Sequence, residues 1–316
     1  MDNKSLEAAN NLIKVFADPC NDPIYHYTSA EGAMGIIENN EVWLTNTEFV
    51  NDTSEGKALK QDFKDTEALG ITNPYVKDKW KFKCNFDDDY NTYIASFSHG
   101  PESLSQWRAY GSFRIGFKAN GLIKRGFNLY QCVYSQDEIK QWILEKEKVP
   151  EWESNDFKDK DILKRAAAFN LIYAASRKYK NKHFKDEQEV RLMTTSHHTW
   201  GLYTNSSSMF EDDSPIHYRT HSAYNMPVPY VKFFIEDVET QKNKQTAVAQ
   251  ETSVQMKERK LSEERNKKRL LLPITEILIG PMIHQKKAET ACKILLKDKG
   301  YEDVVVKISD IPYRGF

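Results

Sequence analysis

Residues 185–193 read KDEQEVRLM and carry charged side chains at alternate positions ahead of two apolar residues. If this stretch is a β-strand, Glu187, Glu189 and Arg191 leave the same face of a sheet, while Val190 and Leu192 point to the core. Two neighbouring carboxylates repel each other, and each raises the pKa of the other unless a cation or a ligand offsets the charge. The stretch therefore predicts a strand that presents a charged site.

Short strands recur around this one, in the first third and the last third of the chain, and helical patterns dominate between them. The expected strands are 23–29, 41–46, 91–98, 113–120, 130–135, 189–195, 228–236, 274–281 and 303–310. The expected helices are 30–40, 57–69, 102–110, 135–148, 160–180 and 285–300. Such irregular interleaving indicates an α+β protein. We predict a single domain with a split, strongly bent mixed sheet flanked by helices.

The predicted domain covers residues 20–314, and two segments are expected to lie outside its core. Residues 1–19 contain a helical pattern that ends at DPCNDP, where proline prevents continuation. Residues 239–269 are almost wholly polar and lack an apolar stripe. A solvated insertion is the preferred interpretation, and an exposed or partner-binding helix is the alternative.

Composition limits the possible classes of protein. The chain has 316 residues, of which 40% are hydrophobic and 12% aromatic, enough to form a core. The 45 basic and 46 acidic residues give a net charge of −1, which does not indicate a general nucleic-acid binder but leaves room for a local basic patch. The four cysteines show no CxxC pairing, and the sequence contains neither a secretory signal nor a membrane span. We expect a cytoplasmic protein with reduced thiols.

His26 is the first candidate for a binding site, in the stretch YHYTS at residues 25–29. A single histidine within a strand is more often structural than functional. Its position near a strand end, next to Thr28, favours a binding role because such ends line clefts.

Ser96, Trp107 and Tyr110 form a second set of candidates in the stretch SFSHGPESLSQWRAYG. Trp107 and Tyr110 lie three residues apart on one side of a short helix. Core packing accounts for such aromatic residues, but the pair could also stack on a planar ligand such as nicotinamide or adenine.

The acids of the opening stretch have two interpretations. Glu187 and Glu189 could lie on an ordinary solvated face with Arg191 as their counter-ion. Alternatively, one acid could hold a hydroxyl group or stabilise a developing cation in a catalytic site. A Mg²⁺ or Mn²⁺ site with Asp52 or His26 ranks last, because no HxH, HExxH or DxD spacing supports it. We predict no metal.

Seven stretches in order resemble a bacterial family, domain of unknown function 2971. They are YHYTS, FVND, SFS, WRAYG, EQEVR, LIGP and SDIPYR, and they extend from about residue 24 to residue 314. That family in turn is similar to a distant branch of the ADP-ribosyltransferase fold, which implies NAD as the substrate that occupies the cofactor site.

The second similarity assigns roles to individual residues. It implies that His26 and Thr28 bind the ribose and adenosine part of NAD, and that Tyr110 stacks on nicotinamide. Glu189 would match the glutamate that grips the ribose hydroxyl, with Glu187 two residues before it. Tyr110 departs from the family pattern because it lies in a Trp-x-x-Tyr segment with helical spacing.

The chemistry that follows is NAD cleavage through an oxocarbenium-like state, which one carboxylate stabilises while the other orients or deprotonates the nucleophile. Arg191 would pair with the acids or a phosphate. The resulting hypothesis is a mono-ADP-ribosyltransferase or NAD hydrolase, acting as a bacterial toxin or anti-phage effector, with an antitoxin or defence partner. The ADP-ribose acceptor stays open between protein, nucleic acid and water. The alternative is a catalytically inert sensor that binds a nucleotide or a partner protein, and a metal-dependent nuclease ranks last.

Overall fold

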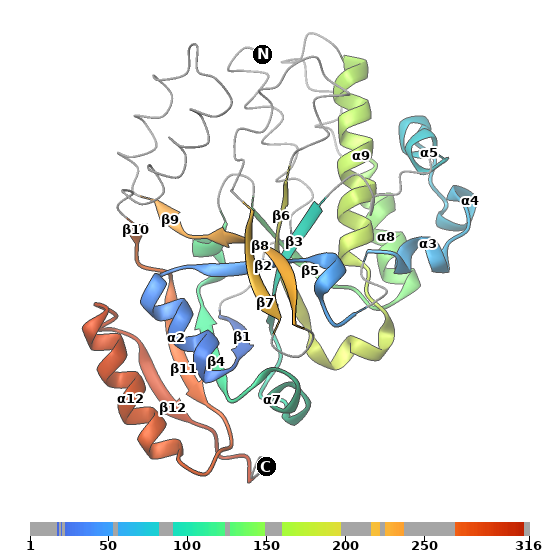
Figure 1. The fold of residues 1–316 in the computed structure, drawn as a ribbon. Coiled ribbons are helices and arrows are strands. Elements are labelled where there is room, and N and C mark those ends of the chain that lie inside the picture. The colour runs from blue at the N-terminus through green and yellow to red at the C-terminus, as the bar shows by residue number, and fades with distance from the viewer. Residues whose placement is uncertain are drawn as a thin grey trace, which may run out of the picture.

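The protein is an α+β structure built on one mixed sheet (Figure 1). The computed structural model describes residues 18, 20, 23–52, 56–81, 91–123, 127–148, 160–196, 216–221, 225–236 and 269–312. The predicted helix at 1–19 and the predicted insertion at 239–269 lie outside these ranges, except for residue 18 of the first and residue 269 of the second.

Ten of the strands in these ranges form the main sheet, in the order β12-β11-β4-β1-β3-β2-β8-β7, with β6 paired to β3 and β5 paired to β6. They are β1 (Ile24–Thr28), β2 (Val42–Asn46), β3 (Asn91–Ser98), β4 (Phe113–Phe117), β5 (Asn128–Gln131), β6 (Glu189–Ser196), β7 (His217–His221), β8 (Met226–Phe233), β11 (Ile274–Ile279) and β12 (Val305–Ile308). A separate short pair joins β9 (Ile235–Glu236) to β10 (Arg269–Leu270). The pair β11–β12 is parallel, as the intervening helix requires, and the other pairs are antiparallel.

The sheet divides at β3. Along one edge, β3 pairs with β6 over its whole length. Its other edge is shared, because β2 pairs at Tyr93 and Ile94 whereas β1 pairs at Ser98. We call the unpaired edge from Ala95 to Phe97 the fork. The prediction of an α+β protein with a mixed sheet flanked by helices is confirmed, but the prediction of a strongly bent sheet is wrong, because the sheet is not strongly curled. At the fork, the same edge of β3 changes its partner from β2 to β1. The two parts of the sheet diverge there, and the sheet need not curl.

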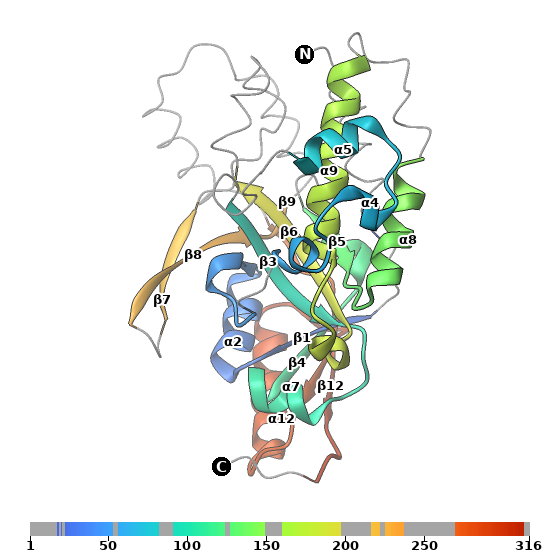
Figure 2. The same ribbon diagram turned by 90° about the vertical axis from the view of Figure 1, so that its right-hand side faces the viewer.

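Helices cover both faces of the sheet (Figures 1 and 2). The helices are α2 (Ala30–Asn39), α3 (Ala58–Asp62), α4 (Thr66–Leu69), α5 (Pro74–Lys81), α7 (Leu104–Tyr110), α8 (Gln136–Lys146), α9 (Lys160–Lys178) and α12 (Gln285–Asp298), with 3₁₀ turns η1 (Thr47–Phe49), η2 (Ala119–Leu122) and η4 (Lys182–Glu187). The side chains of α3–α5, α8 and α9 form one core with Ile94, Tyr130 and Met193 of the sheet. Those of α2 and α12 form a second core with the opposite face.

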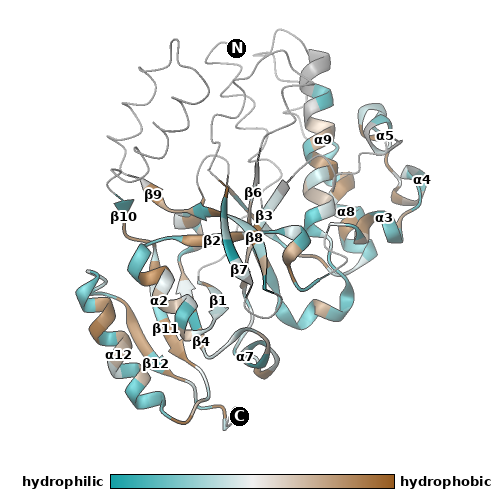
Figure 3. Cartoon of the chain, viewed as in Figure 1, coloured by the Kyte–Doolittle hydropathy of each residue, from teal (hydrophilic) through white to brown (hydrophobic). Residues whose placement is uncertain are grey.

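Local sequence sets the ends of these helices. Ser29 caps α2 by accepting a hydrogen bond from the Gly32 amide at 3.1 Å, and Asn40 ends the helix in the left-handed conformation. The helix predicted at 57–69 is instead two short helices, because Asp65 starts α4 by accepting from the Ala68 amide. In Figure 3, α12 is hydrophobic on part of its surface and hydrophilic on the rest, and its buried residues are Cys292 and Leu296.

Gly280 is required by close packing between two distant stretches of sequence. The Trp107 ring of α7 lies so near that a Cβ added at residue 280 would be 2.7 Å from a ring carbon. Gly280 also donates its amide hydrogen to the carbonyl of Ser112 at 2.8 Å. Trp107 is buried against Tyr27 at a ring-centroid distance of 4.8 Å, so α7 is fixed on β1 and on the end of β11 together.

We expect Gly280→Ala to destabilise the fold by about 1–3 kcal/mol, because the new methyl group cannot fit without moving the ring. The matched control is Gly35→Ala in α2, where the nearest atom to an added Cβ is 4.0 Å away. This change should stabilise the chain by about 0.5–1 kcal/mol. Urea unfolding measures both values, and equal effects of the two substitutions would contradict the packing argument.

Candidate functional site

A buried ionic cluster lies where η4 meets β6, and it contains the three charged residues of the opening stretch. The Lys180 ammonium lies 2.7 Å from Oε2 of Glu187 and 2.7 Å from Oε2 of Glu189. Arg191 donates from Nη2 to the same Glu189 oxygen at 3.0 Å, and its Nη1 donates to the carbonyl of Arg177 on α9. Lys180 was not singled out from the sequence, where it is one of many lysines.

Glu187 and Glu189 do not alternate along one strand, so this prediction was wrong. The strand begins at Glu189, whereas Glu187 is the last residue of η4. Gln188 between them has a left-handed backbone with φ 44°, which changes the direction of the chain. Glu189 is only 3% exposed, whereas the Glu187 side chain is 21% exposed. The two acids therefore lie on either side of Lys180, one inside the protein and one at its surface.

The electrostatics of the cluster favour full ionisation. Burial raises the pKa of Glu189, but Arg191 and Lys180 outweigh it, so the pKa lies far below its usual range. Burial likewise lowers the pKa of Lys180, and the two glutamates more than reverse this effect. Cys132 adds a weak contact from its sulfur to Glu189 at 3.6 Å. Glu189 is thus a buried, ion-paired carboxylate. The prediction that it opens into a cleft is wrong.

Tyr110 joins the exposed side of the cluster. Its hydroxyl donates to Oε1 of Glu187 at 2.9 Å, so that both oxygens of this carboxylate are held. Burial and the neighbouring Glu187 raise the pKa of Tyr110 well above its ordinary value. Tyr110 is 38% exposed, whereas Trp107 is 5% exposed. The prediction that both rings stack on a ligand is therefore wrong for Trp107, which is a core residue. Only Tyr110 is accessible.

Backbone contacts tie the Glu187 turn to the end of β3. Ser98 donates from Oγ to the carbonyl of Glu187 at 2.7 Å, and Gln106 of α7 donates to the same carbonyl at 3.1 Å. The amide of His99 donates to the carbonyl of Gln188 at 3.0 Å. Two of these bonds fix the Glu187 carbonyl and one fixes Gln188 next to it, although the Glu187 side chain is at the surface.

His26 lies in the fork, apart from the ionic cluster. Its Nδ1 donates to the carbonyl of Ser96 at 2.8 Å, at the edge where β3 has no strand partner. Its ring lies 5.6 Å from that of Phe97, which belongs to the face of β3 opposite Glu189. Burial lowers the pKa of His26, and the bond to Ser96 opposes this effect. The expected common cleft of His26 with Glu189 is thus not observed.

Ser96 is the accessible position at the centre of the sheet. Of residues 92–98 of β3, it alone is exposed. Its cross-strand partner is Arg191, and Ser98 on the same face is opposite Glu189. The Ser96 side chain is therefore accessible, although its partner Arg191 is buried in the ionic cluster.

Thr28 is half-buried near Tyr110. A Cβ added at Gly111, which follows Tyr110 and has φ 118°, would be 2.6 Å from the Thr28 carbonyl oxygen. The stretches YHYTS and WRAYG therefore meet here, and WRAYG also meets EQEVR through Tyr110 and LIGP through Trp107. The stretch FVND lies at the other end of β3, next to η1, and residues 313 and 314 of SDIPYR fall outside the described ranges.

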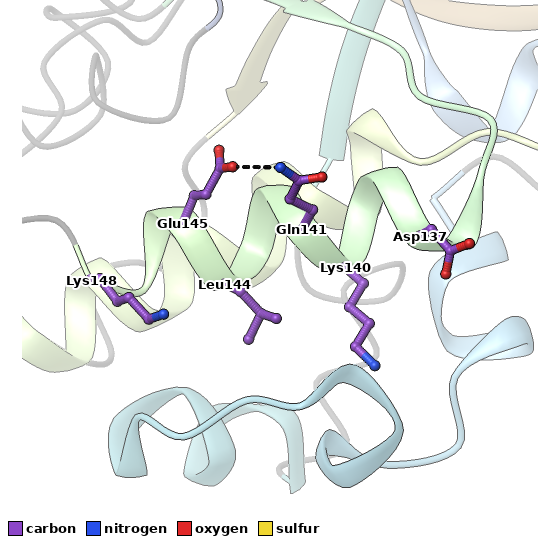
Figure 4. A pocket seen from close by; sticks show the side chains of 6 residues that line it. All are labelled: Asp137, Lys140, Gln141, Leu144, Glu145 and Lys148. Atoms are coloured by element: carbon purple, nitrogen blue, oxygen red, sulfur yellow. Dashed lines mark hydrogen bonds between the residues drawn. The ribbon is translucent and has the colours of Figure 1, made fainter.

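A surface groove on α8 is a separate feature (Figure 4). Its lining residues are Asp137, Lys140, Gln141, Leu144, Glu145 and Lys148. All belong to α8 or follow it directly, and none was predicted as a site residue. The side chains of Lys140 and Leu144 approach Gly70 at the end of α4. The groove therefore lies between surface helices, away from Ser96 and Glu187.

The described residues contain no group of three or more His, Cys, Asp or Glu side chains that could hold a metal ion. Cys20, Cys132 and Cys292 are buried. No helix within the described ranges is long and apolar enough to cross a membrane. No family model, curated protein or solved structure matches the chain. The resemblance to domain of unknown function 2971 remains a prediction that rests on its motifs.

We expect Glu189→Gln to destabilise the folded chain by about 3–5 kcal/mol, because Arg191 and Lys180 would keep buried charges without their shared partner. Chemical denaturation followed by circular dichroism measures the loss. The control is Glu138→Gln on the exposed surface of α8, which should change stability by less than about 0.5 kcal/mol. A similarly small effect of Glu189→Gln would contradict the importance of the cluster.

The same cluster predicts a loss of stability in acid. Because folding lowers the pKa of Glu189, its contribution is present above the ordinary carboxyl pKa of 4.5 and is lost as the pH falls toward the folded value. The Tm should therefore decrease on acidification below about pH 4.5. This decrease should be smaller in Glu189→Gln than in Glu138→Gln, and parallel pH profiles for the two variants would show that Glu189 is not its source.

Proposed function

We propose that the chain is an ADP-ribosyltransferase or NAD hydrolase whose site lies on the open part of the sheet between Ser96 and Glu187. The observation that carries this proposal is the exposure of Ser96 in a central strand opposite Arg191, whose ionic cluster extends through Glu189 and Lys180 to the partly exposed carboxylate of Glu187. Central strands are normally covered on both faces, and an uncovered polar position with charged neighbours is where a ligand can reach the sheet. The fork in the sheet is consistent with an ADP-ribosyltransferase-like fold.

Glu187 is the better candidate for the carboxylate that faces the sugar. Cleavage of the nicotinamide–ribose bond develops positive charge on the ribose, and a fixed carboxylate stabilises that charge. Lys180 and Tyr110 hold one oxygen of Glu187 each, so the carboxylate is oriented before substrate arrives. Its partial exposure allows contact with a ligand, which the burial of Glu189 does not.

Glu189 is then a positioning residue. It stays ionised and attracts Lys180 from the inner side, which places the ammonium group next to Glu187. Arg191 completes the same group from within β6 and lies opposite Ser96. The ionic cluster thus supports the accessible acid instead of reacting itself.

The remaining candidates would contact or shape the site for NAD. Tyr110 offers a partly exposed ring next to Glu187, on which the nicotinamide ring can stack. The backbone of Thr28 packs closely against Gly111, and the exposed Ser96 would contact the ligand from the sheet. His26 would keep the fork open by holding the Ser96 carbonyl. Consumption of NAD in the cytoplasm would suit a toxin or an anti-phage effector.

The test is release of nicotinamide from NAD by the purified full chain. Glu187→Gln keeps the shape and removes the charge, and it should lower kcat about a hundredfold, which corresponds to about 3 kcal/mol of transition-state stabilisation. The matched control is Asp186→Asn, an exposed acid of the same turn, which should keep wild-type activity. Glu189→Gln should lower the kcat of the folded protein less than Glu187→Gln does, because it disturbs Glu187 only through Lys180. Full activity in Glu187→Gln would overturn the assignment.

A catalytically inert module that binds a nucleotide or a partner is the second candidate. Both oxygens of Glu187 already have partners, which suits a carboxylate with a purely structural role. This function predicts NAD or nucleotide binding by calorimetry without any nicotinamide release. Hydrolysis of nucleic acid that requires added Mg²⁺ or Mn²⁺ would instead favour a nuclease.

A further inference from the structure

Aromatic rings form a continuous stack on one face of β2, β8 and β7. Trp43 and Tyr230 are stacked with ring centroids 4.4 Å apart and planes at 28°. The ring of His217 follows at 5.5 Å from that of Tyr230, with an angle of 31°. Strand register places these residues on the same face, because Tyr230 is paired with both Thr45 and His217. Trp43 is 37% exposed and forms the accessible end of the stack.

Cations surround the exposed tryptophan. Arg219 is exposed, and its guanidinium carbon lies 6.0 Å from the centroid of the Trp43 ring. Its Nη2 donates a hydrogen bond to the Thr45 hydroxyl at 3.1 Å. Lys232 is the cross-strand partner of Trp43. Glu41 accepts from the Trp43 indole at 2.7 Å and pairs with Lys232 at 3.1 Å and with Arg269 at 2.8 Å.

Cations outnumber carboxylates in these contacts. Arg219, Lys232 and Arg269 are basic, and Glu41 is the acid that pairs with Lys232 and Arg269. Arg219 instead contacts the Trp43 ring and the Thr45 hydroxyl, and its side chain is exposed, so an external anion can reach it.

We propose that this face binds single-stranded nucleic acid, with an unpaired base stacked on Trp43 and its neighbouring phosphates held by Arg219 and Lys232. Aromatic side chains beside cations recognise single strands because every base has a π-face and every nucleotide carries a negative charge. A duplex offers the phosphates but keeps its bases stacked inside. The inference does not depend on NAD chemistry, because binding is measured without NAD.

The face with Trp43 lies on the same side of the sheet as Ser96. Thr45, two residues after Trp43 on β2, is paired with Ile94 of β3. Ile94 and Ser96 are two residues apart on β3 and therefore share a face. The β7–β8 hairpin projects from the edge of the molecule (Figure 2), so an extended strand can reach it.

The experiment measures fluorescence anisotropy of labelled oligothymidylate and oligouridylate of about 15 nucleotides, titrated with the full chain at low salt. We expect binding of at least one strand type, and the stronger of the two identifies DNA or RNA as the source. Trp43→Ala should weaken it about tenfold or more. Arg219→Glu, at an exposed position that packing does not restrict, should weaken it as well. Arg219→Ala should reduce the slope of log K against log salt by about 0.7.

Two control variants separate recognition from loss of structure. Tyr218→Ala removes an aromatic ring that is 68% exposed on the other face of the same hairpin, and it should bind like the wild type. Lys293→Ala removes an exposed cation of α12 and should leave the salt slope unchanged. Circular dichroism confirms folding of each variant, and Arg219→Glu decides the result if Trp43→Ala does not fold.

Three outcomes would overturn the inference. The first is no binding of either strand at low salt. The second is wild-type affinity in both Trp43→Ala and Arg219→Glu. The third is binding of an oligoglutamate peptide with the same dependence on Trp43 and Arg219, which would identify an acidic protein as the partner instead of nucleic acid.

Discussion

The Glu189 carboxylate, held between Lys180 and Arg191, is the interaction on which the centre of the molecule depends. A charge taken out of water is tolerated only when partners replace its hydration, and here two cations and one acid do so together. Lys180 comes from the segment after α9, and Arg191 also bonds the last turn of α9 through the Arg177 carbonyl. The Glu189 carboxylate therefore connects α9, the longest described helix, to the strand pair of β3 and β6.

A second constraint acts at the fork, where β3 exchanges one neighbour for another. Backbone groups that lose a strand partner must be satisfied in some other way. The His26 ring supplies one such bond to Ser96, and this explains a histidine between two aromatic residues without a catalytic role. On the other edge, β3 keeps its full pairing with β6, so the division costs the sheet few of its hydrogen bonds. The same division leaves Ser96 uncovered and gives the chain an accessible polar position in the middle of its sheet.

Much of the fold could be read from local patterns, whereas the site could not. Alternation and capping residues predicted β3, β6 and α2 closely, since Ser29 and the alternating apolar residues act over a few positions. The left-handed conformation of Gln188 was not predictable, and it removed Glu187 from the strand. Lys180 was missed because its importance comes from a distance in space to two acids, which no spacing in the sequence records. Trp107 and Tyr110 differ in exposure for a similar reason: contacts with Tyr27 and Gly280 bury only Trp107.

The single ammonium group shared by an inner and an outer acid has a consequence for communication within the molecule. Lys180 lies within hydrogen-bonding distance of both acids, and each of them favours its charged form. Neutralising Glu187 at the surface would therefore remove part of what keeps the ammonium group charged and in place, and Glu189 would hold it alone. A change at one surface carboxylate thus alters the charge balance around the buried start of β6.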